Sequence, residues 1–354
     1  MMKISIEAFL ASLKQIRQYV DNLEEKNSIL DEAYDLTSAP EDIKNRIAAL
    51  QSIRTSEKQF AYTVIIITLY GQYETFVERI IKEYLKEMQS GGYNFSQLPP
   101  RIQENYFAKV VGLNTKLEWG KYKHLDNKVI AKSLYETLNL DIHSVLPEAY
   151  YKNGGNYKID ILAECLRDIG IENAKRKLCR YPELQEYYQK KFGLDVNVNE
   201  KDDKVLYGII DEVVEIRNKI AHTGEVDEIR DNTYIKEMFY FFEQFAMSLN
   251  SLMQDTLFEV KWNVNTSMAF KPQKVFKHKN VAGFKDVDFE VHYGQLCLCR
   301  YPKGNFPQFA EARINDIQEK GVSFTKYHLY ENNPFGVGVQ MDISVTDGCS
   351  FKWL

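Results

Sequence analysis

The sequence predicts a mainly helical α+β protein, in which an all-α helical bundle is followed by a small β-barrel-like domain. Apolar residues recur at helical spacing through most of the first 254 residues. After about Asp255, short β-type segments separated by turn sequences replace that pattern. We therefore divide the chain into an N-terminal helical extension (1–54), a helical domain (55–254) and a C-terminal β domain (255–354).

The first two expected helices form the extension. Residues 4–29 carry an apolar stripe made of Ile4, Phe9, Leu13, Ile16, Val20 and Leu23. A second helix is expected to begin near Ser38, because Ser38 and Glu41 have capping-box spacing and Pro40 fits a first turn.

The helical domain opens with a long helix expected from Ser56 to Met88 and ended by Ser90-Gly91-Gly92. Its most apolar stretch, 61–71, is much shorter than the ~20 residues needed to span a bilayer. Shorter helices are expected at 102–111, 127–138 and 159–169, and a surface loop at 193–204. Two more helices follow, at 204–222 and, rich in aromatic residues, at 231–254.

The C-terminal region is predicted to be a barrel or a sandwich of short strands. Turn sequences at 303–305, 332–334 and 347–348 separate the segments. The expected strands lie within 258–264, 285–293, 295–301, 321–330, 337–345 and 349–354.

Composition limits the function classes. Hydrophobic residues make up 44% and charged residues 27%, as in globular proteins, and the formal net charge of -5 means that any contact with RNA must be local. The five Cys lack a C-x-x-C pair, which argues against structural zinc and fits free thiols in a reducing cytoplasm. The charged N-terminus is unlike a signal peptide. We expect no metal, no cofactor and no membrane association.

The segment with the most chemical information runs from Glu215 to Gly224 and reads EIRNKIAHTG. It places Asn218 directly after Arg217, and His222 four residues after Asn218. At about 100° per residue, Asn218 and His222 share a helix face, whereas Arg217 and His222 diverge by about 140°. On a single helix, Arg217 and His222 therefore cannot both face one phosphate well. Two such helices that meet across a two-fold axis could supply both groups to the same phosphate.

This segment resembles the HEPN family motif, in which Arg is followed, four to six residues later, by His, often with Asn directly after Arg. The long helix is also similar to a prokaryotic branch of HEPN nucleases, with Tyr73 where that branch often has Trp, next to Glu74. The resemblance covers roughly residues 55–254. It implies a metal-independent endoribonuclease that acts as a homodimer, with Arg217, Asn218, His222 and Glu74 as catalytic residues.

The expected chemistry is RNA cleavage by attack of the 2′-OH, with His as base and acid and Arg stabilising the phosphorane. The resemblance implies a prokaryotic toxin or antiviral defence effector in the cytoplasm, for which an antitoxin or regulatory partner is conceivable. The rival hypothesis is a non-catalytic HEPN scaffold that binds a nucleotide or a partner protein.

Simpler interpretations stay open for each residue. Arg217 could pair with Glu215 or Asp211, and His222 could be a helix-end residue favoured by the helix dipole. Glu74 could be a solvated charge and Asn218 a structural contact.

Two further regions have alternative interpretations. The Lys175–Arg180 cluster could contact RNA or form a solvated helix face. Residues 275–354 faintly resemble the second-domain β-barrel of translation factors, which would imply binding of RNA such as tRNA. A β appendage for dimerisation is equally compatible.

Overall fold

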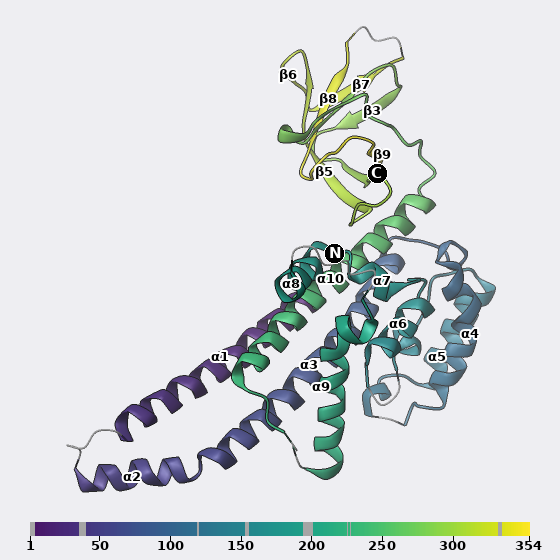
Figure 1. Ribbon diagram of the computed structural model, residues 1–354. Helices are drawn as coiled ribbons and strands as arrows, with labels where there is room; N and C mark the ends of the chain where they lie inside the picture. Colours follow the sequence, from purple (N-terminus) through teal and green to yellow (C-terminus); the bar gives the residue numbers. More distant parts are fainter. Residues whose placement is uncertain are drawn as a thin grey trace.

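The computed structural model describes residues 4–34, 40–118, 120–152, 156–193, 201–224, 226, 228–331 and 335–354. Its helical part is built on three long helices, α1 (Ile4–Tyr34), α3 (Arg54–Ser90) and α10 (Asn232–Val264). Figure 1 shows α1 and α3 extending side by side to the lower left, where α2 (Glu41–Ser52) connects them. The predicted helices at 4–29 and 56–88 are therefore confirmed, whereas Ser38 lies outside the described residues.

The three long helices pack together because each buries one apolar stripe. On α1 the stripe is Ile6, Phe9, Leu13, Ile16 and Val20, and the Phe9 ring stacks on Phe76 of α3 with centroids 4.8 Å apart. The aromatic run of α10 supplies Phe239, Phe241, Phe242 and Phe245, all fully buried. This large apolar area removed from water forms the main core.

Shorter helices pack around this core. In Figure 1, α4 (Pro100–Asn114), α5 (Asn127–Asn139), α6 (Ile159–Asp168) and α7 (Ala174–Leu178) lie to the right of the long helices, whereas α8 (Pro182–Phe192) packs against α10 to the left. Helix α9 (Asp203–Thr223) packs against α3 and α6. The sequence predicted α4, α5, α6 and α9 closely, but no helix was assigned to 182–192.

The C-terminal region is an antiparallel β structure, as predicted. Its main sheet has the strand order β1-β2-β8-β5-β4-β9, β6 pairs with β5, and β3 pairs with β7 separately. The bounds are β1 Lys274–Phe276, β2 Val281–Phe284, β3 Phe289–His292, β4 Leu296–Arg300, β5 Phe309–Glu319, β6 Val322–Ser323, β7 Lys326–Leu329, β8 Val337–Met341 and β9 Ser350–Trp353.

A backbone bridge joins the two ends of this strand path. Phe270, just before β1, exchanges two 2.8 Å hydrogen bonds with Phe351 of β9. This bridge gives the sheet a barrel-like closure, with the aromatic rings of Phe284, Phe289 and Phe351 inside.

One expected strand is wrong: residues 258–264 are the last two turns of α10. Phe258 and Trp262 lie four positions apart, so on a helix they share a face, and this face packs against Leu298 and Phe309 of the β structure. Leu257 and Val260 instead join the helical core. A short apolar run is compatible with the period of a helix or of a strand. Here the contacts on two sides of the segment favour the helix.

Polar contacts also hold the β structure on the end of α10. The Asp255 carboxylate accepts hydrogen bonds from the backbone N–H groups of Gln308 and Phe309, at 2.9 and 2.6 Å, and from the Tyr181 hydroxyl at 2.8 Å. Lys261 pairs with Glu311 at 3.1 Å. The junction is thus packed and hydrogen-bonded rather than a bare linker.

Candidate active site

Helix α9 presents the predicted residues on its last two turns. Its side chains up to Val214 anchor it, since Leu206, Tyr207, Ile209, Ile210, Val213 and Val214 are buried. Gly224 ends the helix in the left-handed region, with φ at 71°, and its N–H donates to the Ile220 carbonyl at 2.8 Å. The predicted stop at Thr223-Gly224 is confirmed.

Arg217 is held in place by two neighbours. Its guanidinium lies over the Tyr70 ring of α3, 4.9 Å from the centroid, and its Nη1 donates to the side-chain amide oxygen Oδ1 of Asn218 at 3.0 Å. The Tyr70 hydroxyl in turn accepts from the backbone N–H of Asn156 at 2.5 Å. The guanidinium is half-buried, so a ring face and an amide fix its orientation and leave donors for an anion.

The carboxylates suggested as simple partners of Arg217 have other contacts. Glu215 pairs with Lys158 at 2.7 Å, and Asp211 accepts from the backbone N–H of Ile159, at the start of α6, at 3.0 Å. These contacts dock α9 onto α6. Arg217 therefore does not form the surface ion pair that the simpler interpretation proposed.

Glu74 lies in the electrostatic field of Arg217. Burial is the main cause that raises the pKa of the Glu74 carboxyl, and the negative charge of Glu78 adds to it, while Lys121 and Arg217 act in the opposite direction. Glu74 makes no hydrogen bond or ion pair within the described part of the chain. A half-buried carboxyl near a guanidinium can exchange protons or position a hydroxyl.

Tyr73, beside Glu74 in sequence, has a structural role. Its ring is fully buried against Phe242, with centroids 5.3 Å apart, and its hydroxyl donates to the Tyr157 carbonyl at 3.0 Å. Tyr73 therefore fixes α3 against α10 and the segment around Tyr157, next to the hydrogen bond between Asn156 and Tyr70.

His222 stands apart from this cluster. It is exposed in the last turn of α9 and makes no hydrogen bond or ion pair with any residue that the structure describes. Asn218 is half-buried one turn earlier. The structure thus places Arg217 against Asn218 and within the electrostatic influence of Glu74, and it leaves His222 exposed to solvent.

The sequence did not single out the cations near this cluster. Lys121 pairs with Glu78 at 2.7 Å, and its charge acts on Glu74. Burial is the main cause that lowers the pKa of Lys116, and the charges of Lys109, Lys121 and Lys152 add to it. These lysines are scattered along the chain and converge only in the fold, so no local pattern marks them.

A second group of cations lies on the β structure. Lys271, Lys274, Lys277, Lys279 and Lys285 are all exposed, and no acidic residue occurs between Glu259 and Asp286. Phe276 is also exposed and lies under the Lys274 ammonium, 4.9 Å from its ring centroid. This basic strip (271–285), with an exposed aromatic ring, is unusual in a chain of net charge -5.

Side chains of the Lys175–Arg180 cluster make contacts within the protein. Lys175 pairs with Asp160 at 2.7 Å and with Asp203 at 2.5 Å, and Arg180 lies over the Phe306 ring at 5.5 Å. These contacts attach α7 to α6, α9 and the loop that leads to β5.

The described part of the chain shows neither a metal-binding cluster nor a membrane-spanning helix. Among the described residues, no group of three or more His, Cys, Asp or Glu is arranged to hold a metal ion. No helix in the described ranges is long and apolar enough to cross a membrane.

The fold and this arrangement define a mainly helical protein with an Arg-Asn…His set at the exposed end of a bundle helix. The model of the RiboL-PSP-HEPN family matches residues 19–255, which is two thirds of the chain, and the chain belongs to this family. No curated protein and no solved structure gives a significant match. The family match includes about half of α1 and all of α2.

Proposed function

We propose that this protein is a metal-independent endoribonuclease. The observation that carries the proposal is the Arg217 guanidinium, held by Tyr70 and Asn218 beside Glu74, on the same helix end as an exposed His222. A fixed guanidinium can stabilise the charge that builds up on a phosphorane. An exposed imidazole can approach a substrate and transfer protons near neutral pH.

In the proposed mechanism, one His222 takes the proton from the ribose 2′-OH, whose oxygen attacks the adjacent phosphorus. The P–O5′ bond breaks, and a second acid donates a proton to the departing 5′-oxygen. Arg217 neutralises the non-bridging oxygens, with Asn218 holding it in place. The products are a 2′,3′-cyclic phosphate and a 5′-OH, and no water is consumed in this step.

The proposed acid is His222 of a second copy, so the active form is a homodimer. Arg217 and His222 diverge on one helix, and His222 does not contact the Arg217 cluster in the protomer. On α3, Ile67 is exposed about one turn before Tyr70, which contacts Arg217, and the exposed Val64 and Phe60 continue the same helical stripe. Exposed apolar side chains of this kind support a protein interface.

The substrate that we propose is RNA, with tRNA as one candidate, docked partly on the basic strip (271–285). Lysines at this spacing can contact successive phosphates, and Phe276 can stack on a base. We further propose a cytoplasmic toxin or defence effector, controlled by an antitoxin or another regulatory partner. The five Cys, all buried and free of disulfides, support a reducing compartment.

Cleavage of labelled RNA by the purified protein tests the chemistry. We expect cleavage in the presence of EDTA, products with cyclic phosphate ends, and loss of cleavage in His222→Ala. Activity that EDTA abolishes and magnesium restores would contradict the mechanism. An intact substrate with the wild-type protein would favour the non-catalytic scaffold.

Analytical ultracentrifugation tests the dimer. We expect a dimer at micromolar concentration, and a shift toward monomer in the variant Phe60→Ser/Ile67→Ser. A wild-type monomer that still cleaves RNA would remove the need for a composite site.

A further inference from the structure

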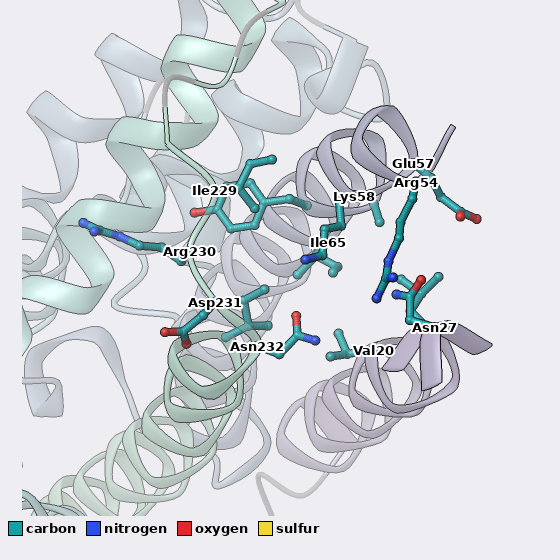
Figure 2. Close-up of a pocket in the computed structure, with 14 residues that line it drawn as sticks. Val20, Asn27, Arg54, Glu57, Lys58, Ile65, Ile229, Arg230, Asp231 and Asn232 are labelled. Atoms are coloured by element: carbon teal, nitrogen blue, oxygen red, sulfur yellow. The ribbon is translucent and has the colours of Figure 1, made fainter. Parts of the chain in front are cut away.

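A separate cavity lies on the other side of the helical domain from the β structure, between α1, α3 and the segment that leads into α10. Figure 2 shows its three walls, with Val20 and Asn27 on α1, Lys58 and Ile65 on α3, and Ile229–Asn232. Its volume is about 460 Å³, within the range of small-molecule sites. None of the four proposed catalytic residues lines this cavity.

The walls of the cavity are mainly apolar. The side chains that give it this character are Val20, Leu23, Ala61, Ile65, Ile229 and Ile235. They come from three elements that are distant in sequence, so the cavity is a product of the fold. An apolar body of a ligand would gain free energy by leaving water for this space.

Two buried polar atoms in the lining have no hydrogen-bond partner of normal geometry among the described residues. The first is the hydroxyl of Tyr62, a side chain that is 1% exposed, and it lies close to the backbone of Arg230, which acts to lower the pKa of Tyr62. The buried Oδ1 of Asn27 also lacks a partner. Buried polar groups are normally hydrogen-bonded, so these two atoms point to a polar group of a bound molecule.

Three of the five charged side chains that line the cavity form ion pairs within the described residues. Arg54 forms a two-point pair with Asp31, at 2.5 and 3.0 Å, and Glu57 pairs with Lys26 at 2.5 Å. Arg230 points toward α9 in Figure 2 and pairs with Glu212 at 3.0 Å.

Asp231 caps α10 by accepting from the Tyr234 N–H at 2.8 Å. Lys58 forms no ion pair within the described residues, and Asp31, which it attracts at longer range, is already used by Arg54. Asp231 also forms no ion pair among the described residues, but its carboxylate points away from Lys58 in Figure 2. Among the described cations of the lining, Lys58 is therefore the one without an acidic partner.

We propose that this cavity is a binding site for a small amphiphilic anion. The apolar body of the ligand occupies the space between Val20, Ala61 and Ile65, and its anionic group meets Lys58. A hydrogen-bonding group of the ligand reaches the Tyr62 hydroxyl and the Asn27 side chain. This proposal does not depend on RNA cleavage, and its test needs no nuclease activity.

The test uses the full-length protein and the fluorescent anion 1-anilinonaphthalene-8-sulfonate, with octanoate and octanol as competitors. We expect saturable binding of one dye per chain and stronger displacement by octanoate than by octanol. Lys58→Gln should weaken the dye and octanoate by about 3- to 10-fold and abolish the preference for octanoate, because it removes the lining cation that has no acidic partner among the described residues. The matched control is Lys86→Gln, an exposed lysine further along α3, which should change nothing.

Two further variants test the interior of the cavity. Ala61→Phe should fill the space and abolish binding, and a measurement of Tm shows whether the variant is still folded. Tyr62→Phe should weaken a hydrogen-bonding ligand such as octanoate by about 3- to 10-fold without lowering the Tm of the free protein, because its hydroxyl has no partner there to lose.

Several results would overturn the proposal. They are dye binding without saturation, equal affinity in the wild type, Lys58→Gln and Ala61→Phe, or equal displacement by octanoate and octanol. A Tm of Tyr62→Phe well below that of the wild type would show that the hydroxyl is bonded within the protein.

Discussion

The two halves of α9 differ in what their side chains do. From Leu206 to Val214 the helix buries six large side chains in the core, whereas from Glu215 to Thr223 only Ile220 is buried. The first half holds the helix in the bundle, and the second displays Arg217, Asn218 and His222. A rigid element that carries reactive groups at its exposed end can be altered at one end without harm to the other.

The largest expected effect is on the rate of RNA cleavage, and it comes from changes at the exposed end of α9. His222→Ala and Arg217→Ala should each lower the rate of RNA cleavage by about 10²- to 10⁴-fold, through loss of proton transfer or of phosphorane stabilisation. Arg217→Lys should not restore the rate, because a point charge lacks the planar fork. Cleavage assays give the rates, and thermal unfolding should show near wild-type stability.

Lys219→Ala is the matched control, since Lys219 is exposed on the same turns. It should change the rate only a few-fold. A marked loss of stability in His222→Ala would contradict this division of α9, because it would show that the exposed end has a structural role.

The buried half should respond in the opposite way. Tyr207 is fully buried, its ring lies 6.2 Å from that of Phe245, and its hydroxyl donates to the Lys175 carbonyl at 2.6 Å. Tyr207→Ala should lower the free energy of unfolding by about 3–5 kcal/mol. Denaturant titration measures this value, and a loss below about 1 kcal/mol would show that this half is not an anchor.

A buried and an exposed histidine differ in the same way, and the buried one makes stability depend on pH. His143 is 4% exposed, and burial lowers its pKa to about 4, whereas His222 is open to water. In the unfolded chain the His143 imidazole takes up a proton at the ordinary pKa of His, near 6.5. The contribution of the neutral His143 to the free energy of unfolding is therefore complete above that pH and is lost as the pH falls toward 4.

Between pH 7 and pH 5 this single group should cost about 2 kcal/mol. His143→Leu should remove that part of the pH dependence, as measured by urea unfolding at both values. An unchanged pH dependence in the variant would mean that His143 is charged in the folded protein.

The smallest expected effect concerns the basic strip (271–285). The triple change Lys271→Gln, Lys274→Gln and Lys279→Gln should weaken RNA binding about tenfold and reduce the slope of log affinity against log salt by about 2. The control changes Lys303, Lys320 and Lys326 of the same β structure to Gln. Equal effects of the two triples would indicate a general loss of charge rather than a docking surface.

The sequence predicted the parts of the molecule that depend on local pattern. The apolar periods of α1, α3 and α9 and the stop at Gly224 could be read directly, because each is a property of consecutive residues. The end of α10 was mistaken because Phe258–Val264 fits two periods and only its contacts with the β structure and the helical core decide between them.

The surroundings of the motif could not be predicted in the same way. The stack of Arg217 on Tyr70 and the approach of Lys121 to Glu74 join segments that are far apart in the chain. The cavity beside Lys58 also needs three such segments. Residue types were therefore foreseeable, but the partner that orients each one was not.

The most direct test of the proposed nuclease activity is the sequencing of cellular RNA ends after expression of the wild type beside His222→Ala. We expect growth arrest and new 5′-OH ends at defined RNA sites with the wild type, and neither with the variant at equal protein level. Identical RNA ends in the two samples would contradict it.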